Sequence, residues 1–581
     1  MAPRPTSPTP TPSSSFTPGP VPRTPSPSPR KKGPAALNPG PPSSSKKKKP
    51  TRSVSFALLA LPFPLASFLH PLRSTSNQWL VVPAILMVAF LFRWAVGLGP
   101  YSGMACPPMH GDFEAQRHWM EITTNLPMKE WYFHDLQWWG LDYPPLTAYH
   151  SWLCGRIGTL INPNWFALHT SRTLDNYHLK LFMRSTSLLS EYLIYIPSVL
   201  LLIRSLSFLP QTTMSKYDLA IATTSILLQP ALILIDHGHF QYNSVMLGFT
   251  LAALAMFTRD HLLWGSFFFV LSLGFKQMAL YYAPAIFFYL LGLCVFPRVN
   301  IPGLLAIGIA TVSTFAILLL PLFISGGIPT LAQVVHRCFP FSRGLWEDKV
   351  ANLWCALNPI IKFRQRFSTT TLQRLSLLAT LATILPPCLI IFFNPRKHLL
   401  PLALAGCAWG FFLCSFQVHE KSVLLPLMPT TLILAQGLDR DTVSWVSWIN
   451  NIANFSMWPL LRRDGLSLQY TIMSIFWAWL MGLGGKWSLP KSNFGKLVQL
   501  GAYAGVLGLH VTELVLDNGM VRSLGSGVEK KVESVLERYP DLIVVGNVGV
   551  CFCAFAWMYG WTVARLWRER LVAGTGKRKR E

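Results

Sequence analysis

A dense group of ionisable residues, GDFEAQRHW (111–119), follows a strongly apolar segment of the chain. Charged residues make up only 13% of the sequence, so this concentration is unusual. Side chains at i and i+2 diverge on a helix but point to one side of an extended segment. Asp112 is therefore a candidate general base, or it caps a short helix whose face pairs Glu114 with Arg117.

A second polar segment, LDYPP (141–145), fixes its own backbone. Pro144 pushes Tyr143 out of the helical region, and two consecutive prolines make a stiff extended corner. The corner either positions the Asp142 carboxylate in a site or returns the chain to the membrane.

A third segment, DHGHFQYN (236–243), places His237 and His239 one residue apart. Metal ligation is one interpretation, but no second ligand set at a familiar spacing accompanies the histidines. Hydrogen bonding to a polyol, with Gln241 as a partner, is the other. We expect no metal and no cofactor.

The fourth segment, FQVHEKS (416–422), brings His419 and Lys421 to the edge of an apolar run. Together with Arg343 they could bind a phosphate close to the membrane surface. The alternative is an interfacial ion pair in which Lys421 extends toward water beside Glu420.

The rest of the sequence consists largely of apolar runs long enough to cross a ~30 Å hydrocarbon core as helices. Residues are 51% hydrophobic and the mean hydropathy is +0.36. A β-barrel would show alternation instead of solid runs. The sequence therefore predicts an all-α polytopic membrane protein with fourteen spans, near 79–99, 179–204, 218–235, 243–258, 262–275, 279–296, 302–325, 372–394, 398–415, 421–437, 443–460, 467–484, 497–516 and 541–563.

The positive charge of the chain lies mainly at its ends, which argues against a nucleic-acid partner. Residues 1–55 form a Pro/Ser/Lys-rich segment that we expect to be a disordered cytosolic tail. With an even number of spans, the basic segment 564–581 is a second cytosolic tail. Two long loops, 100–145 and 326–371, then lie on the opposite side, and 146–160 is an interfacial helix.

This topology places all the polar segments on the non-cytosolic side, together with the GFKQ turn (274–277) and HRCFPFSRGLWEDKVANLW (336–354). Six segments on one side predict one composite site. The ten cysteines include no CxxC pair, so no zinc or redox motif is indicated, and a disulfide among Cys106, Cys338 and Cys355 stays open. Glycosylation of the Asn454 sequon stays open as well.

In the same order along the chain, these six motifs resemble those of the dolichyl-phosphate-glucose-dependent α-1,3-glucosyltransferases of the endoplasmic reticulum. The resemblance runs from about residue 79 to 437, and it implies the GT-C fold with a luminal active site beneath the first long loop. Gly111 and the EAQRHWMEIT stretch resemble the members that add the first glucose to lipid-linked Man9GlcNAc2, rather than the sister enzymes that add the second.

The resemblance implies an inverting transfer for protein N-glycosylation by a domain covering residues 79–563. The donor is dolichyl-phosphate-glucose, the acceptor is lipid-linked Man9GlcNAc2, and the surroundings are lipids of the endoplasmic reticulum. Asp112 is the implied catalytic base, and His419 is the implied partner of the leaving phosphate, assisted by Lys421 or Arg343. Expected substrate-binding residues are Glu114, Arg117, Asp142, Tyr143, His239, Gln241, Arg343, His419 and Lys421.

Three other functions are compatible with part of the pattern. A secondary transporter would use luminal acids and histidines for proton coupling, but no internal repeat supports it. A mannosyltransferase using dolichyl-phosphate-mannose would share the architecture and differ in the motifs. A scaffold protein would not need polar motifs on one side.

Overall fold

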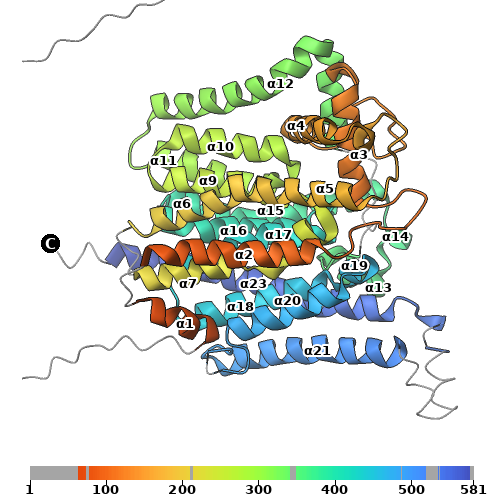
Figure 1. Cartoon of the computed structure of the whole chain (residues 1–581). Coiled ribbons are helices and arrows are strands. Elements are labelled where there is room, and N and C mark those ends of the chain that lie inside the picture. The colour runs from red at the N-terminus through yellow and green to blue at the C-terminus, as the bar shows by residue number, and fades with distance from the viewer. Residues whose placement is uncertain are drawn as a thin grey trace, which may run out of the picture. The chain divides into compact units, whose positions relative to one another are not determined.

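A computed structural model describes residues 63–73, 78–209, 214–339, 349–485, 487–517, 534–535 and 537–575 (Figure 1). Helices dominate these ranges, and none of the residues described there forms a strand. The predicted all-α fold is therefore confirmed. The predicted N-terminal tail lies outside the described residues.

The α-helices are Pro64–Leu69 (α1), Val81–Gly97 (α2), Asp112–Asn125 (α3), Pro145–Ile161 (α4), Tyr177–Ser190 (α5), Ile196–Leu206 (α6), Lys216–Leu227 (α7), Pro230–Ile233 (α8), Asn243–Thr258 (α9), Leu262–Phe275 (α10), Ala283–Val295 (α11), Ile301–Cys338 (α12), Leu353–Ile361 (α13), Phe363–Arg366 (α14), Thr369–Phe393 (α15), Leu400–Cys414 (α16), Leu424–Leu432 (α17), Arg440–Ser456 (α18), Trp458–Arg463 (α19), Ser467–Leu480 (α20), Asn493–Asp517 (α21) and Leu542–Thr575 (α23). Two π-helices, Glu191–Tyr195 (η5) and Leu234–Phe240 (η6), and a 3₁₀ turn, Glu420–Val423 (η9), also contribute to the argument below.

Each predicted span coincides with a helix, but the count of fourteen is not confirmed. Among the described residues, seven helices are long and apolar enough to cross a membrane. Four further apolar helices, α2, α9, α10 and α11, are shorter. A helix rises 1.5 Å per residue, so the 14 residues of α10 extend only about 21 Å. These four helices are therefore shorter than the ~30 Å thickness of a hydrocarbon core.

Two helices continue into segments that were expected to lie outside the membrane. Helix α12 continues to Cys338, past residue 326, where the second long loop was expected to begin. The chain kinks inside this helix at Gly327, whose φ of +66° is accessible because glycine has no Cβ, and Pro329 follows. Helix α23 likewise runs through residue 564, where the C-terminal tail was expected to begin.

The long helices lie side by side, and α3 and α4 lie at one end of them, beside the C-terminal part of α12 (Figure 1). Helix α4 matches the helix expected at 146–160. It exposes large apolar side chains, including Leu153, Ile157 and Leu160, of which Leu160 is 87% exposed. An exposed apolar face of this kind suits a helix lying against lipid.

Candidate active site

A cavity of about 710 Å³ lies among the polar segments. All six segments predicted to share one side contribute to its lining, so the prediction of a composite site is confirmed. Their contributions include, in chain order, Asp112, Asp142, Gln241, Lys276, Arg337 and His419.

Asp112 occupies the first position of α3. The preceding Gly111 is extended, with φ −116° and ψ −156°, and makes no side-chain cap. The Asp112 amide donates to Ser102 Oγ at 3.2 Å, so the hydroxyl takes the place of a capping side chain. Asp112 is therefore not the helix cap, and its carboxylate is left to line the cavity.

Three donors converge on one oxygen of Asp112. His239 Nε2 lies 2.9 Å from Oδ2, and both Gln241 Nε2 and Lys421 Nζ also contact this atom. No described residue hydrogen-bonds the other oxygen, Oδ1. Burial raises the pKa of Asp112, but Lys421 and His239 outweigh this effect and hold the pKa well below its usual value. Asp112 is therefore a carboxylate with one oxygen committed and the other available to a ligand.

The π-helix η6 carries His239 and leads directly into Gln241, and both side chains contact Asp112. Asp236 stabilises its end by accepting from Asn243 Nδ2 at 2.8 Å and from the Ser244 amide at 2.6 Å. Single π-helical turns occur frequently at functional sites because the extra residue re-aims neighbouring side chains. Here η6 ends just before Gln241, which turns into the cavity.

The two histidines of η6, His237 and His239, contact different carboxylates. His237 Nε2 contacts Glu191 Oε2 at 2.5 Å, and Glu191 also binds Arg93 at 2.7 Å. His239 is 1% exposed and contacts Asp112 without itself lining the cavity. In the part of the chain that the structure describes, no three or more His, Cys, Asp or Glu side chains are placed to hold a metal ion.

Lys276 is a site residue that the sequence analysis did not select. Its Nζ donates to Asn243 Oδ1 at 2.7 Å and lies 4.8 Å from the centre of the Tyr143 ring. Burial and the nearby Lys421 lower the pKa of Lys276 to about 8. The available signal was its position as the one cation in GFKQ, between two apolar runs.

The extended corner at 141–145 forms one wall of the cavity, and both Asp142 and Tyr143 line it. Arg337 holds the corner in place, donating to the Leu141 carbonyl at 3.1 Å and to the Gly140 carbonyl at 2.8 Å. Arg337, near the C-terminus of α12, thus joins this helix to backbone carbonyls at the start of the corner.

His419 and Lys421 line the cavity at the start of η9. Lys421 reaches across to Asp112 and also lies 3.2 Å from His239 Nε2. Arg343, the third cation expected near a phosphate, lies outside the described residues.

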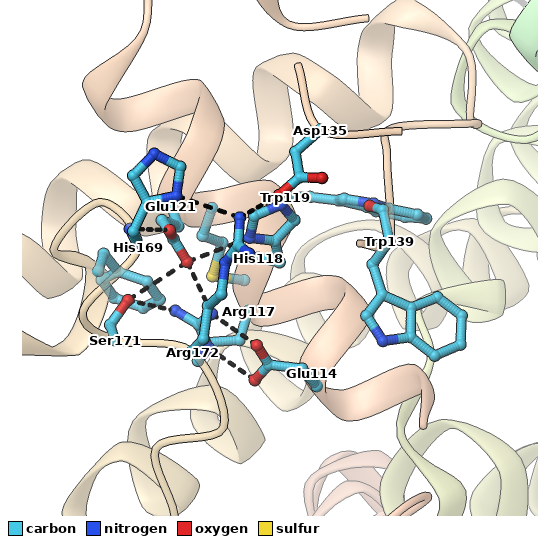
Figure 2. A network of polar contacts seen from close by, with 12 residues as sticks. Glu114, Arg117, His118, Trp119, Glu121, Asp135, Trp139, His169, Ser171 and Arg172 are labelled. Carbon is cyan, nitrogen blue, oxygen red and sulfur yellow. Dashed lines mark hydrogen bonds and ion pairs between the residues drawn. The ribbon is translucent and has the colours of Figure 1, made fainter. Parts of the chain in front are cut away.

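Glu114 and Arg117 do not line the cavity, and instead belong to a buried network of polar contacts (Figure 2). Arg117 Nη2 contacts Glu114 Oε1 and Glu121 Oε2, each at 2.7 Å, while its Nη1 donates to Ser171 Oγ at 2.6 Å. Burial raises the pKa of Glu121, but His118 and Arg117 lower it to about 2. The Glu114–Arg117 pair has i,i+3 spacing and the Arg117–Glu121 pair has i,i+4 spacing. Ion pairs of this kind on one helix face were the alternative to a catalytic role for the segment. They lie on the face of α3 opposite to Asp112.

Asp464 is the second residue that the sequence did not reveal. Its Oδ2 lies 2.5 Å from His239 Nδ1, on the side of the ring remote from Asp112. Asp464 follows α19 and is far from every polar motif in the sequence, so no local pattern signals it.

The structure also answers two questions that the sequence left open, on the cysteines and on the Asn454 sequon. All ten cysteines are free thiols in the structure. Asn454 is 1% exposed and donates to Ser474 Oγ at 2.7 Å, so the folded chain buries the sequon asparagine.

The sequence profile of the ALG6, ALG8 glycosyltransferase family matches residues 89–563, a range that includes every cavity residue named above. A Schizosaccharomyces pombe relative, named a probable dolichyl pyrophosphate Man9GlcNAc2 alpha-1,3-glucosyltransferase, is 46% identical over 87% of this chain and 95% of its own length. A Saccharomyces cerevisiae relative, named dolichyl pyrophosphate Man9GlcNAc2 alpha-1,3-glucosyltransferase, is 50% identical over 72% of this chain and 77% of its own. A Gallus gallus relative of the latter name is 40% identical over 85% of this chain and 98% of its own. The chain therefore belongs to the ALG6, ALG8 glycosyltransferase family.

Proposed function

We propose that this chain transfers the first glucose from dolichyl-phosphate-glucose to lipid-linked Man9GlcNAc2, in α-1,3 linkage, for protein N-glycosylation. The activity for which three relatives are named, each aligned over most of its length, supports this assignment. The structural observation that carries it is that the Asp112 carboxylate lines one cavity together with Lys276, His419 and Lys421.

Asp112 is the base in this scheme. The donor glucose is β-linked and the product is α-linked, so the anomeric carbon inverts in one displacement. The acceptor hydroxyl loses its proton to Asp112 Oδ1 as its oxygen forms the new bond to the anomeric carbon. The bond to the phosphate oxygen breaks at the same time, and the phosphate leaves with the electron pair.

Cations of the cavity stabilise the departing phosphate. A phosphate is a good leaving group and needs charge stabilisation rather than protonation. His419 has this role, with Lys276 and Lys421 on the same cavity. Because Lys421 also binds Asp112, the donor phosphate competes for it. Weakening of that ion pair raises the basicity of Asp112 when the donor is bound.

The protein is a multi-pass protein of the endoplasmic-reticulum membrane in this proposal, with both termini in the cytosol and the cavity on the luminal side. Catalytic charge is then placed at a membrane surface, where it costs less than in hydrocarbon. Asp142, Tyr143 and Gln241 line the cavity and bind sugar hydroxyls.

The test is an assay of the purified enzyme with two donors and two acceptors. We expect transfer from dolichyl-phosphate-glucose to lipid-linked Man9GlcNAc2, with addition of one glucose and no transfer from dolichyl-phosphate-mannose. Transfer only to an acceptor that already carries one glucose would assign the chain to the sister reaction. Transfer of mannose would overturn the proposal.

A further inference from the structure

Three aromatic residues, Trp119, Tyr143 and Trp139, line one part of the active-site cavity. The rings of Trp119 and Tyr143 lie 4.9 Å apart, and Lys276 Nζ lies 4.8 Å from the centre of the Tyr143 ring. Trp119 Nε1 in turn donates to the Trp139 carbonyl at 2.9 Å. A continuous series of contacts therefore leads from the cation, through Tyr143 and Trp119, to Trp139.

The backbone of Trp139 is held in an unusual conformation. Its φ is +46°, in the left-handed region that glycine adopts freely and a bulky residue rarely adopts. Trp119 holds the carbonyl of Trp139, and Arg337 holds the next carbonyl, that of Gly140, at 2.8 Å. Strained residues of this kind persist where surrounding contacts hold them, and they gather at ligand sites.

The side chain of Trp139 has no polar group left for a ligand. The indole N–H is its only donor, and it is committed to the Met109 carbonyl at 2.5 Å. Met109 precedes Asp112 by three residues, so the indole lies beside the segment that leads into Asp112. Trp139 is half-buried and lines the cavity. It therefore offers a ligand a flat aromatic face rather than a hydrogen bond.

A sugar ring fits such a face. The face of an indole is electrically negative and attracts the weakly positive hydrogens of C–H groups. A pyranose presents C–H groups on one side and hydroxyls around its rim, so it stacks on the indole while its hydroxyls meet polar side chains. Gln116, four residues after Asp112 on α3, lines the same cavity and supplies an amide for these hydroxyls.

The proposed displacement indicates which sugar lies there. In an inverting transfer the acceptor oxygen attacks the anomeric carbon from the side opposite to the departing phosphate. His419 and Lys276 mark the phosphate in the proposed function, and Asp112 marks the acceptor oxygen. The donor glucose lies between them, and the acceptor sugar lies beyond it, beside Asp112. Trp139, bonded to the segment that leads into Asp112, is on the acceptor's side.

We infer that Trp139 is an acceptor-binding residue whose indole face stacks on a mannose ring of the lipid-linked glycan. This inference rests on the proposed function and adds to it a residue that holds the acceptor beside Asp112. Stacking stabilises the bound acceptor and the transition state alike. Its loss therefore raises KM for the acceptor and leaves kcat nearly unchanged.

The test is the kinetics of Trp139→Ala with both substrates varied. We expect KM for lipid-linked Man9GlcNAc2 to rise about 10-fold, the change expected when ~50 Å² of apolar contact is lost. We expect kcat and KM for dolichyl-phosphate-glucose to stay close to wild type. Trp139→Phe loses the bond to Met109 but keeps an aromatic face, so it recovers most of the acceptor affinity.

Trp138→Ala is the matched control. Trp138 is the neighbouring tryptophan, but it does not line the cavity, and its ring lies 5.3 Å from the Arg172 guanidinium carbon. The control keeps the wild-type KM for the acceptor. A rise equal to that of Trp139→Ala would contradict the inference, because a general disturbance of the loop would then account for both.

A wild-type acceptor KM in Trp139→Ala, or an equal loss in Trp139→Ala and Trp139→Phe, would overturn the inference. Failure of the proposed function is a separate result, because the wild-type enzyme would then transfer no glucose to lipid-linked Man9GlcNAc2.

If Trp139→Ala does not fold, fluorine NMR of the wild-type protein labelled with 5-fluorotryptophan decides. The chain has 21 tryptophans, and the signal that Trp139→Phe lacks is that of Trp139. We expect lipid-linked Man9GlcNAc2 to shift this signal and dolichyl-phosphate-glucose alone to leave it in place. A signal that the acceptor does not move, or that the donor alone moves, would overturn the inference.

Discussion

Helix α3 carries carboxylates on two faces, and the carboxylates on each face serve a different purpose. On one face, Glu114 and Glu121 enclose Arg117 in a buried network whose oxygens and nitrogens are matched to one another (Figure 2). On the other, Asp112 has three donors on one oxygen and a cavity beside the second. Both faces carry ionised carboxylates, but only Asp112 lines the cavity and can be reached by a ligand.

This comparison shows how a short segment can hold a structural and a chemical site at once. Residues two positions apart on a helix point about 200° apart, so Asp112 and Glu114 belong to different environments. The buried network fixes the helix, and the fixed helix presents its first residue to the substrate. We expect substitutions on the two faces to affect different measurable quantities.

The largest expected effect on stability is from Arg117→Leu. The change leaves Glu114 and Glu121 buried without their cation, and loss of one partner of a buried pair costs about 3–5 kcal/mol. Thermal unfolding of the detergent-purified protein measures the loss. Arg463→Leu is the control, because Arg463 is exposed. An unchanged unfolding temperature for Arg117→Leu would contradict a structural role for this face.

His419→Ala tests the cavity side of the comparison. Removing one donor that stabilises developing charge costs about 2.7–4 kcal/mol, or 10²–10³ in turnover. We expect this loss in kcat with an unfolding temperature close to wild type and little change in KM for the glycan acceptor. Wild-type turnover would remove His419 from the mechanism.

Glu114→Gln sharpens the contrast, since the amide still accepts from Arg117 while Glu121 keeps its ion pair. The expected cost is about 1–3 kcal/mol of unfolding free energy, the penalty for weakening a buried charged hydrogen bond. Activity per folded molecule remains close to wild type. A large loss of kcat in a stably folded variant would show that Glu114 also serves the reaction.

The smallest expected effect is on the pH dependence of stability. The pKa of Glu121 in the folded chain is about 2, below the ordinary value of 4.5. Its contribution to stability is therefore present above pH 4.5 and is lost as the pH falls through 2. Unfolding temperatures measured across this window decline less for Glu121→Gln than for the wild type. Parallel curves for the two proteins would exclude this contribution.

The sequence was sufficient to predict the helical fold and the segments that meet at the cavity, because both depend on local patterns. Apolar runs indicate the helices, and counting them places Asp112 and His419 on one side. The sequence did not indicate that Glu114 would turn away from Asp112, since this depends on where α3 begins. Nor did the sequence indicate that α12 continues to Cys338, because packing sets where a helix ends.

Asp464 and Lys276 show a different limit. Neither belongs to a recognisable local motif, and the role of each depends on a partner far along the chain. Only the folded structure shows that Asp464 lies behind His239. A search for acids that follow a membrane helix would have found Asp464, but it could not have selected it.

The most direct test of the central claim, that Asp112 is the base, is glucose transfer by Asp112→Asn. Asn has the same size as Asp and ranks with it in helix termini, but it cannot take the acceptor's proton. The account predicts a normally extracted and folded protein whose turnover with dolichyl-phosphate-glucose and lipid-linked Man9GlcNAc2 is reduced at least ~10²-fold. Transfer at close to the wild-type rate would contradict it, and Asp142, the other carboxylate lining the cavity, would be the next to test.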